Sequence, residues 1–341
     1  MRRLSLLDSM KFSELGYELS EENRVRIGFG WRIPEFPIDR TRGPEFIAQI
    51  LRSLERVEES FDSAWLSDHM MPWAEWQSPD TDNLEGWTTI NYLIGSFKRL
   101  SFGHIVLCNS YRNPALLAKM TATLSLLAPG RFILGIGAGW NKDEYLSYGY
   151  EFPDASARVE ALAEAVQIIR KMWTENVIYF RGKHFSVTGA YCNPKPNPLP
   201  PIMIGGGGEK LTLKVVASYA DWWNCPNLTV EQYRHKLEVL KNHCERVGRN
   251  YEAIKKTWLG CISIAETQDE ALRIAKNNPF VAKETRFDAM RSTIIGTPER
   301  VSQRLAEFID LGVEYFIFRF LDFPNMKGIE LFTEKVAEEL R

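Results

Sequence analysis

The stretch that decides the fold is residues 99–140, RLSFGHIVLCNSYRNPALLAKMTATLSLLAPGRFILGIGAGW. An apolar run over 100–107 precedes a helical pattern over 114–127, and a second apolar run over 131–137 ends among glycines. Short apolar runs joined by one amphipathic helix are typical of parallel strands with a helical crossover. This stretch therefore predicts an α/β architecture.

The same alternation continues on both sides of this stretch. The predicted strands lie at 25–30, 63–67, 100–107, 131–137, 201–205, 220–224, 257–264 and 313–318. The predicted helices lie at 45–59, 85–97, 114–127, 156–173, 210–218, 230–247, 298–311 and 326–340. Eight strands, each followed by a helix, favour a (β/α)8 TIM barrel over an open sheet.

Two segments interrupt the alternation. The residues VIYFRGKHFSVT at 177–188 predict a β-hairpin inserted after the fourth helix. The polar, weakly patterned segment 271–295 predicts a long mobile loop, a lid over the site, before the seventh helix. We expect one barrel domain over 24–341, preceded by an N-terminal extension over 1–23.

The composition points to an enzyme for small molecules. The 341 residues carry 42 basic and 44 acidic side chains, a net charge of −2, and no long Lys/Arg run, which argues against a nucleic-acid partner. A membrane span needs about 20 consecutive apolar residues, and we find none. The five cysteines form no C-x-x-C pair, so we expect free thiols in a reducing cytoplasm.

In a barrel of this kind, the chemistry lies at the C-terminal ends of the strands. The second predicted strand ends in WLSDHMMPW at 65–73. Asp68 next to His69 is a pair that can carry proton transfer, because a carboxylate can orient an imidazole and raise its pKa. The alternative is a structural hydrogen bond at the start of a loop. No Cys, His or carboxylate spacing typical of zinc occurs, so no metal is expected.

Two glycine-rich stretches follow other strands. GIGAG at 135–139 would let a cofactor approach the backbone, or would make a tight turn. It is not a Rossmann motif, because Trp140 and Lys142 stand where a third glycine is required. The run from Gly205 through Gly206 and Gly207 to Gly208 opens a helix, and we expect its N–H groups to hold a phosphate.

Indoles also follow several predicted strands. If the barrel is correct, some of them line an aromatic cleft at its mouth and bind substrate. Core packing is the alternative. The predicted substrate-binding residues are Trp31, Trp73, Trp140 and Trp223.

Together these motifs resemble the luciferase-like monooxygenase superfamily and, within it, the branch that uses the 5-deazaflavin coenzyme F420. The resemblance rests on segments 65–73, 99–145, 201–224 and 294–320, and it covers about residues 24 to 320. It implies a barrel of the bacterial luciferase type.

The resemblance also implies roles for single residues. Asp68 and His69 would lie beside the deazaflavin ring, with His69 as the catalytic proton donor or acceptor. A cis peptide between Ile105 and Val106 would press against the ring. The residues implied to border the ring and the ribityl chain are Gly137, Gly139, Trp140 and Asn141, and those implied to hold the phosphate are Gly205, Gly206, Gly207 and Gly208.

The implied activity is hydride transfer between C5 of coenzyme F420 and a small organic substrate. The F420-dependent glucose-6-phosphate dehydrogenases carry a Glu directly after the G-x-G-x-G stretch, where this chain has Trp140. That difference predicts an apolar or aromatic substrate in place of a sugar phosphate. The alternatives are an FMN-dependent monooxygenase that activates O₂ and a flavin-binding barrel without catalysis.

Proteins of this superfamily are commonly dimers, and we expect a homodimer. The helices after the second and third strands are the predicted interface, with Trp87, Tyr92 and Phe97 in the first of them. Burial of these three side chains against the barrel is the alternative.

Overall fold

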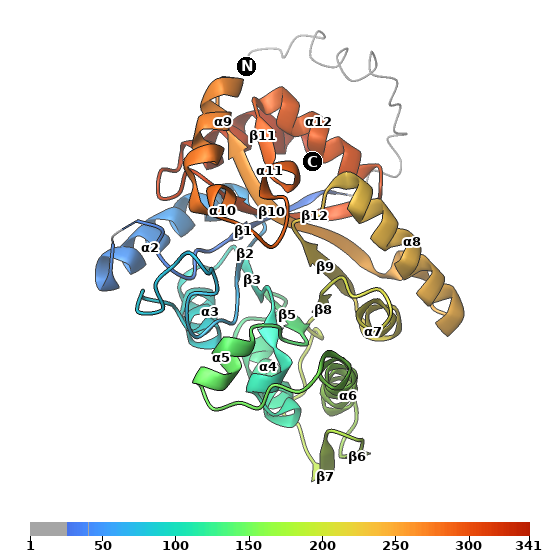
Figure 1. Ribbon diagram of the computed structural model, residues 1–341. Coiled ribbons are helices and arrows are strands. Elements are labelled where there is room, and N and C mark those ends of the chain that lie inside the picture. The colour runs from blue at the N-terminus through green and yellow to red at the C-terminus, as the bar shows by residue number, and fades with distance from the viewer. Residues whose placement is uncertain (1–25, 40) are drawn as a thin grey trace, which may run out of the picture.

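Eight parallel strands close into a barrel in the computed structural model, which describes residues 26–39 and 41–341 (Figure 1). The last strand pairs with the first, with Phe29 opposite Phe316, and this pairing closes the ring. The barrel strands are β1 Gly28–Arg32, β2 Ser63–Leu66, β3 Ser101–His104, β5 Phe132–Gly137, β8 Ile202–Gly205, β9 Trp222–Pro226, β10 Lys255–Ile264 and β12 Val313–Phe320. The predicted fold class is confirmed, and the N-terminal extension at 1–23 lies outside the described residues.

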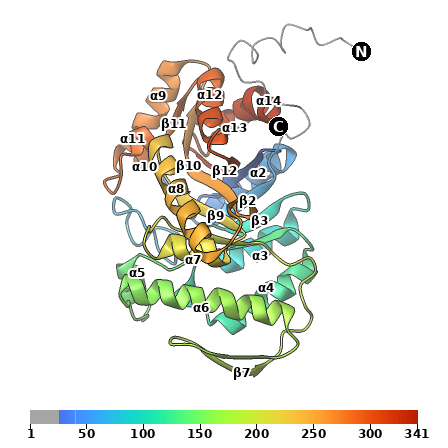
Figure 2. The same cartoon turned by 90° about the vertical axis from the view of Figure 1, so that its right-hand side faces the viewer.

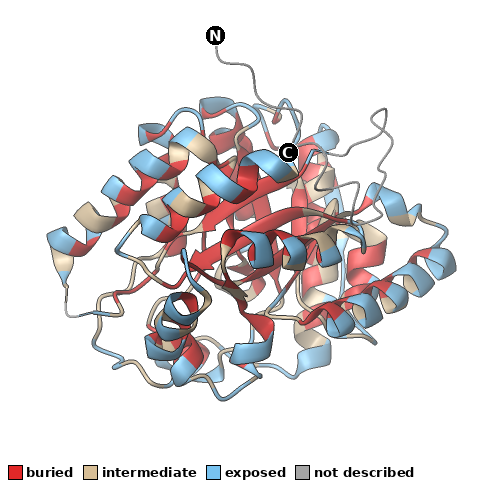
Figure 3. Ribbon diagram, turned by 90° about the horizontal axis from the view of Figure 1, so that it is seen from above, coloured by how far each residue is buried: buried red, intermediate tan, exposed pale blue. Residues whose placement is uncertain are grey.

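Helices return the chain from each strand to the next and cover the barrel with their buried faces inward (Figure 3). Each predicted helix is present within a few residues of its expected bounds. The helices are α2 Gly43–Ser60, α3 Gly86–Ser96, α4 Pro114–Leu127, α6 Ala155–Thr174, α7 Thr212–Tyr219, α8 Val230–Val247, α12 Pro298–Ile309 and α13 Lys327–Phe332, which continues through the π-helical turn Thr333–Ala337 into α14 Glu338–Leu340. None of the helices in the described part of the chain is long and apolar enough to cross a membrane.

Local sequence explains where these helices begin and end. The side chain of Asp154 accepts the N–H of Ala157 at 2.8 Å and caps α6. Helix α8 begins with a capping box between Thr229 and Gln232 and ends at Gly248, whose φ of 69° suits a residue without Cβ. These caps satisfy backbone groups that the first and last turns leave without helical partners.

The third strand is shorter than predicted. After β3 the chain passes through a cis peptide bond between Ile105 and Val106 and then forms β4 Leu107–Cys108, which pairs with β5. The structure thus has the cis bond that the family resemblance implies. Ile105 and Val106 line a cavity described below.

The predicted hairpin is present as β6 Ile178–Arg181 and β7 Ser186–Ala190, which pair antiparallel. Figure 2 shows the hairpin alongside α6, below that helix in the view. The carboxylate of Glu164 on α6 accepts the backbone N–H groups of Lys183, His184 and Phe185 at 2.7, 2.9 and 2.9 Å. One α6 side chain therefore fastens the turn of the hairpin to the barrel.

The expectation of a long irregular loop over 271–295 is wrong. The structure places α9 Gln268–Asn277, α10 Pro279–Ala282 and α11 Ala289–Ser292 there, followed by β11 Ile294–Gly296, which pairs with β10. In α9 the buried residues are Ala271 and Ala275, and the Thr267 side chain caps the helix by accepting the N–H of Glu270. A short irregular segment at 283–288 remains between α10 and α11.

Candidate active site

The C-terminal ends of the barrel strands surround a cavity of about 600 Å³. This volume lies within the range of about 300–1,000 Å³ that is usual for small-molecule sites. Most of the predicted site residues meet at this cavity, although they come from the ends of four different strands. Those that line it are Asp68, His69, Trp73, Ile105, Val106, Gly137, Gly139, Trp140, Gly205 and Gly206.

Two of the predicted substrate-binding indoles are core residues instead. Trp31 is 1% exposed and packs against Phe323, while Trp223 is fully buried and its Nε1 donates to the carbonyl of Gly206. Neither side chain lines the cavity. Side chains alternate between the two faces of a strand, so an indole at a strand end faces either the ligand or the surrounding helices.

Only two of the four glycines predicted to hold a phosphate line the cavity. Gly207 and Gly208 do not line the cavity, and the N–H of Gly206 already donates to the carbonyl of Asn224 at 2.9 Å. Helix α7 begins only at Thr212. Asn141 likewise lies off the cavity, because its side chain caps α5 Lys142–Ser147, a short helix that the sequence did not predict.

Asp68 is buried, and its hydrogen bonds are made with residues other than His69. Its carboxylate accepts the N–H of Cys108 at 2.9 Å and two guanidinium N–H groups of Arg112 at 2.7 and 3.0 Å. Burial raises the pKa of Asp68, and the ion pair with Arg112 opposes this effect. The expected pairing of Asp68 with the neighbouring imidazole is therefore wrong, and Asp68 instead ties the loop after β2 to the segment that follows β4.

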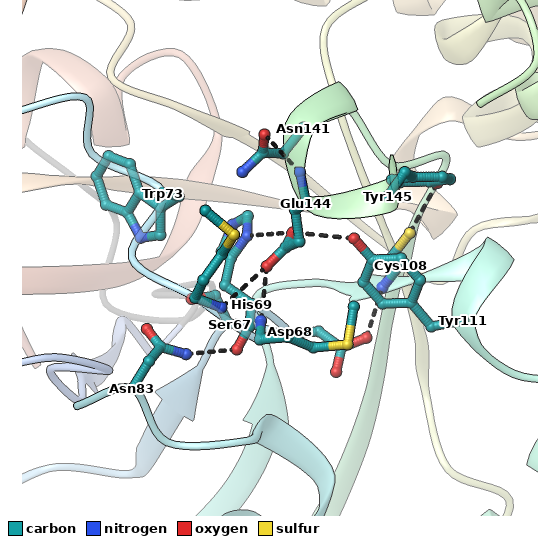
Figure 4. A network of polar contacts seen from close by, with 12 residues as sticks. Ser67, Asp68, His69, Trp73, Asn83, Cys108, Tyr111, Asn141, Glu144 and Tyr145 are labelled. Carbon is teal, nitrogen blue, oxygen red and sulfur yellow. Dashed lines mark hydrogen bonds and ion pairs between the residues drawn. The ribbon is translucent and has the colours of Figure 1, made fainter. Parts of the chain in front are cut away.

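The carboxylate that His69 contacts belongs to Glu144 on α5, with Nδ1 and Oε2 2.9 Å apart (Figure 4). Glu144 is 1% exposed, and it also accepts the N–H of Met70 at 2.6 Å and the hydroxyl of Tyr111 at 2.9 Å. Burial raises the pKa of Glu144, but these three bonds outweigh burial and hold the pKa below its ordinary value. Glu144 was not predicted from the sequence. An acidic residue about one helical turn after the glycine-rich stretch was a signal that could have identified it.

Two indoles flank His69, those of Trp73 and Trp140, and both line the cavity. The Trp140 ring lies edge-on to the imidazole, with centroids 5.7 Å apart and planes at 73°, and the Trp73 ring lies 6.2 Å away. The indole N–H of Trp73 donates to the buried carboxylate of Glu35, which fixes the orientation of this ring. The imidazole thus lies in an aromatic wall of the cavity.

Three guanidinium groups surround the Trp73 ring. Those of Arg286, Arg319 and Arg32 lie 4.8, 5.3 and 5.7 Å from its centroid. Burial opposes ionisation of Glu35, but the positive charges of Arg32 and Arg319 hold its pKa far below the ordinary value. Burial lowers the pKa of Arg319 to about 10. Sequence analysis missed these residues, because single arginines in separate segments form no motif.

Comparison with known proteins agrees with this geometry. The luciferase-like monooxygenase family matches residues 28–315. An F420-dependent glucose-6-phosphate dehydrogenase of Kineococcus radiotolerans is 31% identical over 313 residues, which cover 85% of this chain and 91% of that protein. The corresponding enzyme of Amycolatopsis mediterranei is 27% identical over 327 residues, with 88% and 95% covered.

A solved structure shares the fold. It is an F420-dependent secondary alcohol dehydrogenase in complex with an F420–acetone adduct, and it superposes with a TM-score of 0.76 at 20% identity, covering 93% of this chain and 99% of that one. At this identity the likeness concerns the fold alone, whereas the family match spans most of the sequence. The chain therefore belongs to the luciferase-like monooxygenase family.

Proposed function

We propose that this protein is an F420-dependent oxidoreductase that moves a hydride between C5 of the deazaflavin and a small organic substrate. The observation that carries the proposal is the His69–Glu144 pair, which opens onto the cavity beside Ile105 and Val106. The relatives that align over most of this chain are named as F420-dependent dehydrogenases. In the monooxygenase alternative the same barrel would bind FMN.

The cavity fits a flat tricyclic group. A Cβ on Gly137 would come within 2.7 Å of Val106, and a Cβ on Gly205 would come within 2.8 Å of it, so these positions leave Val106 room to form one wall. Ile105, Val106 and Leu107 make that wall apolar, while Thr212 and Gln232 add polar groups near Gly206. Coenzyme F420 bound there would supply the site that accepts or donates hydride.

The residues of this chain would supply the rest of the chemistry. His69 exchanges a proton with the substrate, because an imidazole nitrogen can accept a proton and later donate it. Asp68 and Arg112 hold the loop that carries His69, and the indoles of Trp73 and Trp140 shield the reacting atoms from water. Orientation and proton transfer are the contributions that we assign to the protein.

We also propose that the substrate carries an anionic group. The expectation of an apolar or aromatic substrate rested on Trp140 replacing a carboxylate, yet Glu144 places a carboxylate in the same cavity. Arg32 and Arg286 line the cavity beside Trp73, and the buried Nε of Arg32 has no hydrogen-bond partner among the described residues. A phosphate or carboxylate on the substrate would accept from Arg32 and be attracted by the charge of Arg286, which pairs with Glu284 at 2.6 Å. The sugar phosphates named for the relatives belong to this class.

Binding measurements test the cofactor proposal. We expect the purified protein to bind oxidised coenzyme F420 with micromolar or tighter affinity in a fluorescence titration, and to bind FMN at least about tenfold more weakly. Tight FMN binding without F420 binding would overturn the proposal. Oxygen uptake that depends on reduced FMN would establish the monooxygenase instead.

We retain the homodimer and the cytoplasm as proposals. Trp87 stacks on the buried His104, and Phe97 is 8% exposed, so the structure assigns these two predicted interface residues to the barrel. Tyr92 on α3 and Leu127 on α4 remain exposed and available for a partner subunit. All five cysteines are free, as a reducing compartment requires.

A further inference from the structure

We infer that Glu144 fixes His69 in the tautomer that carries its proton on Nδ1, so that Nε2 is the nitrogen that exchanges protons with the substrate. Glu144 is then a positioning residue that acts through His69. The inference deepens the role of His69 in the proposed function, but its first test needs neither coenzyme nor substrate.

The hydrogen bonds around Glu144 require the proton between Glu144 and His69 to lie on Nδ1. Oε1 is occupied by the N–H of Met70 at 2.6 Å, with the N–H of Met71 at 3.4 Å. Oε2 faces His69 Nδ1 at 2.9 Å and accepts the hydroxyl of Tyr111 at the same distance. An ionised carboxylate can only accept hydrogen bonds, so Nδ1 must be the donor in its pair.

Nε2 is left free for chemistry. It has no hydrogen-bond partner within the residues that the structure describes, and the His69 side chain is 14% exposed and lines the cavity. Trp140 and Trp73 pack beside the ring and limit its rotation. A neutral imidazole with Nδ1–H presents a bare Nε2, which is the form that can take a proton.

The fixed tautomer would matter in both directions of the reaction. When an alcohol is oxidised, its O–H bond breaks and the proton adds to Nε2, while the hydride leaves the carbon for the coenzyme named above. In the reverse direction Nε2 returns the proton. The carboxylate of Glu144 stabilises the imidazolium that forms between these steps, because opposite charges then lie 2.9 Å apart. The other ionisable groups around this ring are Asp68, next to it in sequence, Tyr111 behind Glu144, and Arg286, whose guanidinium contacts both indoles.

The substitution Glu144→Gln is expected to reverse the tautomer. The backbone N–H of Met70 can only donate a hydrogen bond, so in the variant it is expected to bond to the oxygen of the new amide. The amide NH₂ then faces Nδ1 and forces that nitrogen to accept, which moves the imidazole proton to Nε2. The change keeps the size of the side chain, so the packing of α5 should survive.

Nitrogen-15 NMR of histidine-labelled protein measures the tautomer directly. The chain has five histidines, and the variant His69→Gln identifies the signals of the one in question. We expect the Nδ1–H form in the wild type, the Nε2–H form in Glu144→Gln, and the wild-type form in Tyr111→Phe, which removes only the second donor to Oε2. The inference would be overturned if His69 in the wild type carried its proton on Nε2 or showed an even mixture of the two tautomers. It would also be overturned if the Glu144→Gln spectrum matched the wild-type spectrum.

Kinetics supply a second readout once a substrate is found. Glu144→Gln should lower kcat by at least about tenfold with coenzyme affinity changed less than about twofold, while Tyr179→Phe at the exposed hairpin should stay near wild type. Equal kcat in Glu144→Gln and the wild type would contradict the positioning role. If the protein fails to bind coenzyme F420, the proposed function falls while the NMR result still decides the tautomer.

Discussion

Asp322, just after β12, is a partly buried acid whose ionisation opposes folding. Its carboxylate accepts the N–H of Gly328 at 2.7 Å, and burial raises its pKa to about 6. The unfolded chain would have a pKa near 3.9, so the folded state binds the proton more tightly. The resulting stabilisation is complete below about pH 4 and is lost as the pH rises through about 6.

We therefore expect Asp322→Asn to gain stability relative to the wild type as the pH rises. The amide keeps an oxygen for Gly328 but cannot ionise. Between pH 4.5 and 8 the difference in unfolding free energy should move by about 2 kcal/mol in favour of the variant. Urea unfolding at several pH values measures this shift, with Asp310→Asn at an exposed position as the control. Parallel pH profiles for Asp322→Asn and the wild type would contradict the argument.

At the level of residues, sequence analysis identified the segments of the site better than the pairings within it. Asp68 and His69 were found as neighbours, but the carboxylate that contacts His69 lies 75 residues further along the chain. Closure of the barrel and the unpredicted helix α5 create that contact, and no local pattern encodes it. Trp31 lies within β1 and packs in the core, whereas Trp73 lies in the loop after β2 and lines the cavity.

At the level of elements, the β6–β7 hairpin depends on one carboxylate of α6. Glu164→Ala removes the acceptor for the N–H groups of Lys183, His184 and Phe185. Hydrogen bonds to a charged group contribute about 1.5–3 kcal/mol, so amide exchange at the turn should accelerate by about ten- to hundredfold. Hydrogen–deuterium exchange of peptides spanning 178–190 measures this effect.

The matched control for that experiment is Glu160→Ala. Glu160 contacts the side chains of Lys183 and His184 at the surface, and these are weak exposed ion pairs. Its removal should leave exchange at the turn nearly unchanged, and neither variant should alter coenzyme binding. If amide exchange at the turn accelerated equally in both variants, a general destabilisation of α6 would explain the effect. The role assigned to the Glu164 hydrogen bonds would then be wrong.

The elements themselves were largely predictable. The strands and the helix over 99–140 lie close to where the sequence places them, except that β3 ends at His104. The segment at 271–295 was misjudged although Thr267 and Glu270 form a helix-start signal for α9. The family resemblance implied the cis bond between Ile105 and Val106, whereas the split of the third strand into β3 and β4 was not predicted.

At the level of the whole molecule, the homodimer is the open prediction. Obligate interfaces are rich in apolar side chains, and Tyr92 on α3 with Leu116 and Leu127 on α4 are 60%, 56% and 76% exposed. We expect light scattering after size exclusion to give twice the chain mass of 39.3 kDa. The substitutions Tyr92→Glu and Leu127→Glu together should halve that mass, whereas Tyr179→Glu on the hairpin should not. A monomeric wild type would refute the proposal.

The division of the tryptophans between core and cavity makes the protein its own fluorescent reporter. Trp31, Trp65, Trp223 and Trp258 are buried in the barrel, where the solvent and any ligand are out of reach. Trp73 and Trp140 line the cavity, and Trp140 is 51% exposed. Occupancy of the cavity should therefore quench or shift the emission of Trp73 and Trp140 against a background that includes the four buried indoles, so unlabelled protein can be screened against libraries of candidate substrates.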